Sequence, residues 1–105
     1  TIVEGELESV IKEIQKMAGE KESQGYRTGI IATKETVNRY SGSNIKCIGT
    51  RRDESTVAAN LYGILREFDA DGTDYIYSES FDTEGIGSAV MNRLLKAAGH
   101  RIIQV

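Results

Sequence analysis

The chain has 105 residues, which is enough for one domain. Hydrophobic residues make up 39% of it and charged residues 28%, a balance typical of globular proteins and not of disordered ones. The formal net charge of −3 argues against direct binding of nucleic acid, and no apolar stretch approaches the ~20 residues that a membrane-spanning helix needs.

The first elements alternate between strand and helix patterns. Residues 1–3 are β-prone, and residues 5–22 carry apolar side chains at the spacing of an amphipathic helix. These apolar positions are Leu7, Val10, Ile11, Ile14, Met17 and Ala18. Gly25 fits the position just past the end of that helix. Residues 28–32 form a short unbroken apolar run that predicts a buried strand, and residues 33–40 predict a brief helix capped by Thr33.

The same alternation continues through the middle of the chain. Residues 44–48 predict a strand that contains Cys47, and this cysteine is interpreted as a small buried apolar residue. Asp53 or Ser55 could cap the next helix, and this helix is predicted to end at residues 69–72. The core-facing positions of this helix are Val57, Leu61, Ile64, Leu65 and Phe68.

The last elements repeat the pattern once more. Residues 74–78 are aromatic and β-branched and predict a strand. A loop at residues 79–84 follows this strand. A final helix is predicted up to Gly99, and residues 101–105 predict the last strand. The apolar positions of this helix are Ile86, Val90, Met91, Leu94, Leu95 and Ala98.

This order of elements predicts an α/β fold. We expect a three-layer, Rossmann-like domain with a mostly parallel sheet of about five strands and helices on both faces. No repeat or linker divides it, so residues 1–105 form a single domain in this interpretation. The sequence begins at Thr1 without an initiator methionine, and we expect it to be a piece of a longer protein.

The cysteine and histidine content limits the chemistry that the chain can perform. One cysteine excludes an intramolecular disulfide and a cysteine-rich zinc site. The sole histidine, His100, follows a predicted helix end and completes no catalytic set, so neither catalytic residues nor a metal site are predicted. Glutamates at positions 4, 6 and 8 interrupt any apolar run that could form a signal peptide, and a cytoplasmic location is expected.

A glycine pair offers one candidate binding loop. Gly85, Gly87 and Ser88 come shortly after a predicted strand and open a predicted helix, where backbone N–H groups could hold an anion. The third position of the dinucleotide-binding pattern is Val90 instead of glycine or alanine. The competing interpretation is that the two glycines only allow a tight turn and close packing of the helix.

A second group of candidates lies at the carboxyl edge of the predicted sheet. Arg51 and Arg52 follow one strand, Glu79 ends another, and Thr33 and Lys34 share the same edge. Ligands of open α/β sheets bind at this edge. These side chains are either solvated loop charges or a polar rim that faces a ligand or another domain, and composition does not decide between the two.

The second half of the chain resembles a known family. The residues that carry the resemblance are Asn60-Leu61-Tyr62, Leu65-Arg66, Asp69, Gly72, Asp74, Ile76, Glu79 and the run from Glu84 to Leu94, Glu-Gly-Ile-Gly-Ser-Ala-Val-Met-Asn-Arg-Leu. This pattern is similar to the C-terminal domain of L-threonylcarbamoyladenylate synthases in the Sua/YciO/YrdC family. The likeness is close over residues 60–98 and rests on the order of elements before that. Ser78 and Ser80 depart from the alanine and glycine usual there, and the loop after Glu79 lacks the family's usual proline.

The resemblance implies a parent enzyme that joins threonine, bicarbonate and ATP into threonylcarbamoyl-AMP and releases pyrophosphate. Such a nucleotidyltransferase acts in the threonylcarbamoyladenosine modification of tRNA, with ATP and Mg²⁺ bound by a separate YrdC-like catalytic domain. None of the family's catalytic residues can be placed on this chain. The resemblance therefore implies an inactive accessory domain that binds no cofactor and docks on and covers its partner, the catalytic domain. The alternative is an autonomous nucleotide- or phosphate-binding α/β module that uses the loop at Gly85 and Gly87.

Overall fold

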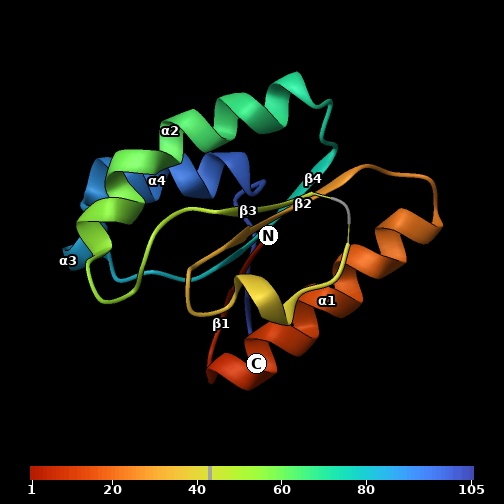
Figure 1. The fold of residues 1–105 in the computed structure, drawn as a ribbon, viewed down its shortest axis with the longest axis horizontal. Helices are drawn as coiled ribbons and strands as arrows, with labels where there is room; N and C mark the ends of the chain where they lie inside the picture. The colour runs from red at the N-terminus through yellow and green to blue at the C-terminus, as the bar shows by residue number, and fades with distance from the viewer. Residues whose placement is uncertain (43) are drawn as a thin grey trace.

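A computed structural model describes residues 1–42 and 44–105 of the chain. Five strands form one sheet in the order β3-β2-β4-β1-β5, and each neighbouring pair is parallel (Figure 1). The strands are β1 (Ile2–Glu4), β2 (Thr28–Ala32), β3 (Ile45–Cys47), β4 (Tyr75–Glu79) and β5 (Ile102–Gln104). The expected parallel sheet of five strands is confirmed.

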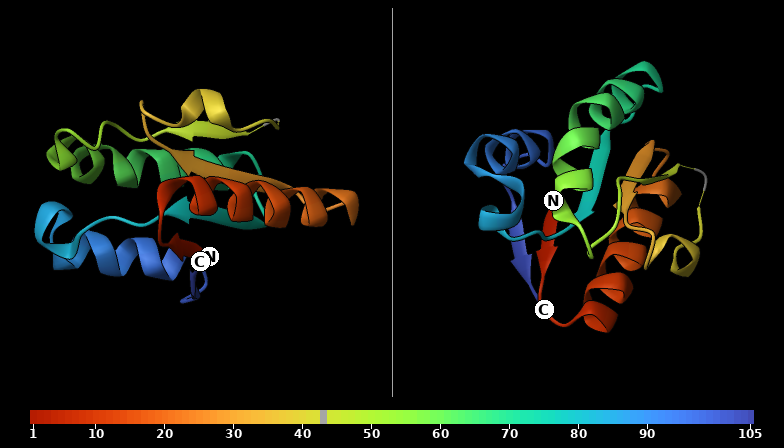
Figure 2. Two further views of the ribbon diagram at one scale, coloured as in Figure 1. Left: turned by 90° about the horizontal axis from the view of Figure 1, so that it is seen from below. Right: turned by 60° about the vertical axis from the view of Figure 1, so that its left-hand side comes forward.

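Helices cover both faces of this sheet, as the alternating pattern predicts (Figure 2). The helices are α1 (Leu7–Ser23), the 3-10 turn η1 (Val37–Arg39), α2 (Glu54–Ala70), α3 (Thr83–Ile86) and α4 (Ser88–Ala97). Helix α1 packs on β4, β2 and β1 from one side, and α2, α3 and α4 pack together on the other. None of the helices in the described ranges is long and apolar enough to cross a membrane.

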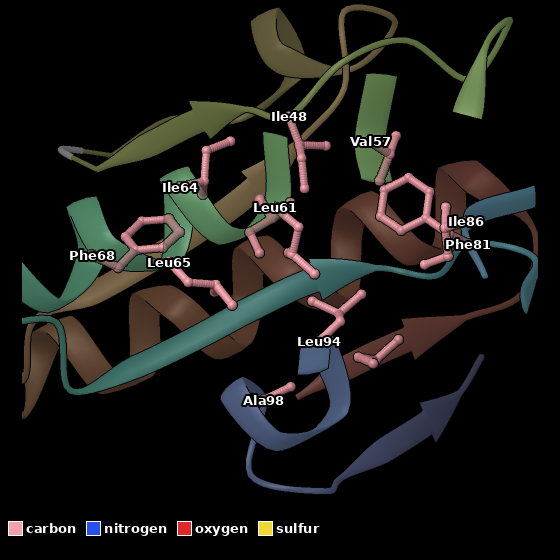
Figure 3. Packing of buried hydrophobic residues seen from close by; sticks show 12 residues of the cluster. Ile48, Val57, Leu61, Ile64, Leu65, Phe68, Phe81, Ile86, Leu94 and Ala98 are labelled. Atoms are coloured by element: carbon pink, nitrogen blue, oxygen red, sulfur yellow. The ribbon is translucent and has the colours of Figure 1, made fainter. Parts of the chain in front are cut away.

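Each face of the sheet has its own hydrophobic core. The core between the sheet and α2, α3 and α4 is shown in Figure 3 and contains Ile2, Ile31, Ile48, Val57, Leu61, Ile64, Leu65, Phe68, Phe81, Ile86, Leu94 and Ala98. The core beneath α1 contains Val3, Val10, Ile11, Ile14, Ala18, Ile30, Ala32, Tyr40 and Tyr77. Because both faces of the sheet are covered, every residue of β2 is buried.

Local capping sets the helix ends close to the predicted positions. Glu6 and Asp53 cap α1 and α2, because their side chains accept hydrogen bonds from backbone N–H groups of the first turn at 3.2 and 3.1 Å. Gly25 follows the end of α1 with a φ of +92°, a conformation that favours glycine. The sequence did not identify Glu6 as a cap.

Three expectations need correction. The helix predicted at residues 33–40 is a single 3-10 turn, because Thr36 and Tyr40 on either side of it are held by hydrogen bonds to Glu79, with Tyr40 in an extended conformation. The last helix is two helices, because Gly87 has a φ of +90° and interrupts it; Gly85 therefore lies inside α3 and not in a loop. Cys47 is exposed and not buried, because it is the last residue of an edge strand only three residues long.

Candidate functional site

The carboxyl ends of β1 and β4 lie side by side, and the chain leaves them toward opposite faces of the sheet. After β1 it enters α1 on one face, whereas after β4 it enters α3 and α4 on the other (Figure 2). The same divergence occurs between β2 and β4, because η1 lies on the α1 side. Open α/β folds bind ligands where neighbouring connections diverge in this way. The residues at the end of β4 are therefore the first candidates for a functional site.

Glu79 ends β4 at this point, and its side chain is 0% exposed. Its Oε2 accepts hydrogen bonds from Thr36 Oγ1 at 2.6 Å and from the Tyr40 hydroxyl at 2.7 Å. Its Oε1 accepts a hydrogen bond from Arg51 Nη2 at 2.9 Å. A buried carboxylate is tolerated only when it is paired and hydrogen-bonded, and these three donors meet that requirement. Glu79 is thus an internal anchor and not a solvated rim charge.

Tyr40 donates a hydrogen bond to this carboxylate and is hard to deprotonate. Burial, the hydrogen bond to Glu79 and the negative charge of Glu79 together raise the pKa of the Tyr40 hydroxyl. Thr36 is buried as well, and its Oγ1 also accepts a hydrogen bond from the backbone N–H of Thr33. The segment after β2 is therefore fixed to the end of β4 by two neutral donors.

Arg51 comes from the loop after β3 and completes the group. Its guanidinium lies 4.8 Å from the centre of the Phe81 ring, in addition to the ion pair with Glu79. Its side chain is 30% exposed, while its Nε is buried and has no hydrogen-bond partner among the described residues. Arg52 is exposed, and its side chain forms no ion pair within residues 1–42 and 44–105. The two adjacent arginines therefore differ in role.

Glu35 links the loops after β2 and β3 on the outside of this group. Its carboxylate accepts hydrogen bonds from Thr50 Oγ1 and, at 2.9 Å, from the backbone N–H of Arg51. These two bonds lower the pKa of Glu35 to about 2. Three loops are thereby joined at the carboxyl edge. We call Thr36, Tyr40, Arg51 and Glu79 the edge cluster.

The edge cluster leaves little room for a ligand. A shallow hollow of about 180 Å³ beside it is lined by Gly5, Leu7, Val10, Arg51 and Ser80. The positive charge of Arg51 at its rim is already compensated by Glu79. The arrangement can hold loops in place, because Thr36, Tyr40 and Arg51 all donate to Glu79 within the chain. Among the described residues, Arg51 Nε is the buried donor of this group that has no partner.

Gly85, Gly87 and Ser88 are not part of the edge cluster: Gly85 lies inside α3, Gly87 separates α3 from α4, and Ser88 begins α4. A Cβ atom on Gly85 would come within 2.5 Å of Glu54 Oε2, so glycine allows the close approach of α2 and α3. Gly87 supplies the positive φ between the two helices and offers no side chain to cap α4, which begins at Ser88. Asp82 caps α3, accepting a hydrogen bond from the Glu84 N–H at 3.2 Å. The Glu54 carboxylate therefore lies beside Gly85.

Of the candidate residues, the structure brings Arg51 and Glu79 together and buries Thr33 against Thr36 beside them. Arg52 and the candidate loop at Gly85, Gly87 and Ser88 are not part of this group. The sequence analysis missed Thr36 and Tyr40, whose only signal is that they follow a buried strand at the carboxyl edge. Across the described ranges, 1–42 and 44–105, no group of three or more His, Cys, Asp or Glu side chains is placed to hold a metal ion.

Comparisons of the sequence and of the structure with known proteins point to the same family. Residues 1–99 match the family described as threonylcarbamoyl-AMP synthase, C-terminal domain. The threonylcarbamoyl-AMP synthase of Bacillus subtilis is 45% identical over 91 residues, which cover 87% of this chain and 26% of that protein. The match extends well before the motif-bearing residues 60–98.

Solved structures agree in fold and extent. Sua5 of Pyrococcus abyssi complexed with L-threonine superimposes with a TM-score of 0.80 at 32% identity, covering 99% of this chain and 29% of that one. The C-terminal Sua5 domain from Pyrococcus horikoshii superimposes with a TM-score of 0.73 at 30% identity, covering 99% of this chain and 93% of that one. The chain spans about a quarter of the length of the multi-domain relatives that it matches.

Proposed function

Because the chain belongs to the family of threonylcarbamoyl-AMP synthase C-terminal domains, we propose that it is the non-catalytic accessory domain of such a synthase. In this proposal residues 1–105 are one domain of a longer protein, and they dock on and cover a YrdC-like catalytic domain. The parent enzyme acts in threonylcarbamoyladenosine modification of tRNA. It is a cytoplasmic nucleotidyltransferase that joins threonine, bicarbonate and ATP and releases pyrophosphate.

The edge cluster is the observation that supports the proposed accessory role. The point where an α/β fold would bind a ligand is occupied by Glu79 and its three internal donors. The Glu79 side chain is 0% exposed, so its carboxylate has no open side from which a substrate could reach it. The loops that it fixes form a rigid polar edge, which suits contact with another domain better than chemistry. ATP and Mg²⁺ would accordingly be bound by the catalytic domain.

The proposal is tested with three proteins: the full-length synthase, a form lacking residues 1–105, and residues 1–105 alone. Pyrophosphate release is measured with ATP, threonine and bicarbonate, and with each substrate omitted in turn. Turnover is expected from the full-length protein and not from residues 1–105. Adding residues 1–105 in trans to the truncated form should restore little, because a severed linker loses its effective concentration. Turnover by residues 1–105 alone would contradict the accessory role.

Docking is tested on the same proteins by hydrogen exchange. Exchange of backbone amides in the loops after β1, β3 and β4 should slow in the full-length protein relative to residues 1–105 alone. Equal exchange of every exposed loop in the two proteins would refute docking, while leaving the activity measurement intact.

A phosphate-binding module remains the second candidate, and one observation favours it. Helix α4 begins after Gly87 without a side-chain cap, so the N–H groups of its first turn are available to an anion. The Glu54 carboxylate lies beside Gly85, and Asp82 and Glu84 lie at the start of α3, only a few residues before this turn; their negative charges disfavour an anion here. We therefore expect ATP and AMP to bind with dissociation constants at or above ~1 mM. Saturable amide NMR shifts at Gly87 and Ser88 with micromolar nucleotide would favour the module instead.

A further inference from the structure

The outer strand β5 has a hydrogen-bonding edge that the rest of the fold leaves open. It forms one margin of the sheet, beside β1 (Figure 2). Among residues 1–42 and 44–105, no strand pairs with the outer side of β5. Ile102 and Val105, at this margin, are 47% and 44% exposed and are among the most exposed large apolar side chains. This margin therefore offers both apolar surface and free backbone groups.

Hydrogen bonds to β1 determine which backbone groups of β5 point outward. The Arg101 carbonyl and the Val105 N–H bond to β1 at 2.8 and 2.9 Å. Successive residues of a parallel strand direct their N–H and C=O groups to opposite sides. Ile103 therefore also faces β1, whereas Ile102 and Gln104 direct their N–H and C=O groups away from the sheet.

The side chains of β5 alternate between the two faces of the sheet. Ile103 is in register with Val3, which lies in the core beneath α1, so Ile103 is on the α1 side. Ile102 is in register with Ile2 and lies on the opposite side of the sheet. Edge strands are usually protected from pairing by charged residues, proline or a bulge. The three residues of β5 include no charged residue and no proline.

The opposite margin of the sheet, formed by β3, is protected by a charge. Lys46 lies in the middle of β3 and is paired with Glu67 and Asp71 at 3.4 and 3.2 Å. The backbone groups of Asn44 and Ile48 bond to β2, so the residues on either side of Lys46 direct their backbone groups outward. Two copies joined antiparallel through these groups would place Lys46 opposite Lys46, which is destabilising. Only the β5 margin is therefore suited to pairing with its own copy.

We propose that the outer edge of β5 pairs with β5 of a second copy of this chain, antiparallel about a two-fold axis. The outward N–H and C=O groups of Ile102 would bond to those of the partner's Gln104, and symmetry repeats the pair. Ile103 would then lie opposite the partner's Ile103, in a close non-hydrogen-bonded pair of β-branched side chains. The two sheets would become one continuous sheet. This pairing is independent of the proposed accessory role, since it uses only the groups of β5.

A second copy is the occupant that the edge fits, because the pattern of β5 is its own complement. Two residues with outward backbone groups flank one apolar residue, and no charge requires a counter-charge on the partner. A pair of short strands alone is marginal, and stable interfaces bury ~1,200 Å² or more. Val105 and Leu7, which are 44% and 37% exposed, lie on the α1 side like Ile103 and would add their apolar surface to the contact.

The first test measures the mass of the full-length protein by sedimentation over a series of concentrations. We expect a dimer with a dissociation constant on the order of 10 µM or below. Ile102→Lys should weaken the dimer at least about tenfold, because a lysine on the edge blocks pairing. Tyr62→Lys is the matched control, since Tyr62 is 44% exposed on α2, and it should leave the dimer unchanged. A monomer at every concentration would overturn the proposal; slow exchange of the Ile102 and Gln104 amides in that monomer would assign the edge to another part of the same chain.

The second test examines the register with single cysteines. Cys47→Ser and replacement of other native cysteines remove background thiols. Ile103→Cys should form an intermolecular disulfide under mild oxidation, because the Cα atoms of a non-hydrogen-bonded pair lie ~4.5 Å apart, within the range that a disulfide spans. Ile102→Cys is the matched control and should stay unlinked, because it faces the partner's Gln104. A dimer in which Ile103→Cys does not cross-link, or in which both variants cross-link equally, would refute pairing through β5.

Discussion

Replacing Arg51 by alanine should destabilise the domain far more than the same change at its neighbour. Arg51 is the only charged partner of the buried Glu79 carboxylate among the described residues. Alanine removes this partner and also the contact with the Phe81 ring. Glu79 would then keep the two neutral donors Thr36 and Tyr40 and lose its counter-charge.

The size of the effect follows from the exposure of the two partners. Removing one member of a fully buried ion pair costs ~3–5 kcal/mol. The Arg51 side chain is 30% exposed, so water can enter and recover part of this. A lost hydrogen bond to a charged group costs ~1.5–3 kcal/mol. We therefore expect a loss of about 2 kcal/mol in the free energy of unfolding and a fall in Tm of about 10 °C.

Urea denaturation of four proteins checks this reasoning: the unchanged chain, Arg51→Ala, Arg52→Ala and the double variant Arg51→Ala/Glu79→Gln. Arg52→Ala is the matched control and should change the free energy of unfolding by under ~0.5 kcal/mol. The double variant should be more stable than Arg51→Ala alone, because a neutral amide needs no counter-charge. If Arg51→Ala matched Arg52→Ala, the edge cluster would not stabilise the fold.

Four further substitutions probe the core, the pH response and the glycines. Leu65→Ala should cost ~2–5 kcal/mol in urea denaturation, because its side chain is buried beneath α2; a cost below ~1 kcal/mol would refute that packing. The lowered pKa of Glu35, about 2 against an ordinary 4.5, contributes stability that is present above pH 4.5 and lost as the pH falls toward 2. Glu35→Gln should flatten the loss of stability over that interval, and an unchanged acid profile would contradict it. Gly29→Ala should destabilise by ~1–3 kcal/mol, since the new methyl group would overlap the Phe68 ring. Gly63→Ala, in the interior of α2 with open space around it, should instead stabilise by ~0.5–1 kcal/mol; calorimetry that ranked the two glycine variants in the reverse order would refute both.

The order of strands and helices could be predicted because each element carries its own periodic pattern. Val57, Leu61 and Phe68 repeat at helical spacing, and residues 28–32 are apolar throughout because both faces of β2 are covered. The same reasoning misjudged Cys47, since strand periodicity does not show which strand lies at the edge of a sheet. Edge position is a property of strand order, and strand order depends on contacts between distant parts of the chain.

The edge cluster could not be predicted from the sequence, for a related physical reason. Glu79 and Arg51 could be assigned to the carboxyl edge, because both follow predicted strands. Their pairing, and the burial of Glu79, required knowing that β2 and β4 are neighbours, which brings Thr36 and Tyr40 to the same carboxylate. The sequence pattern around Gly87 suggested a binding loop. Only its backbone conformation shows that Gly87 separates two helices.

The carboxyl edge of the sheet has the position of a ligand site but the contacts of a structural one. Glu79 accepts its three side-chain hydrogen bonds from Thr36, Tyr40 and Arg51, and these bonds hold together the loops after β2, β3 and β4. Because the Glu79 side chain is 0% exposed, its oxygens are not offered to a ligand in solution. The outer surfaces of these loops are therefore what this edge presents for the proposed contact with another domain.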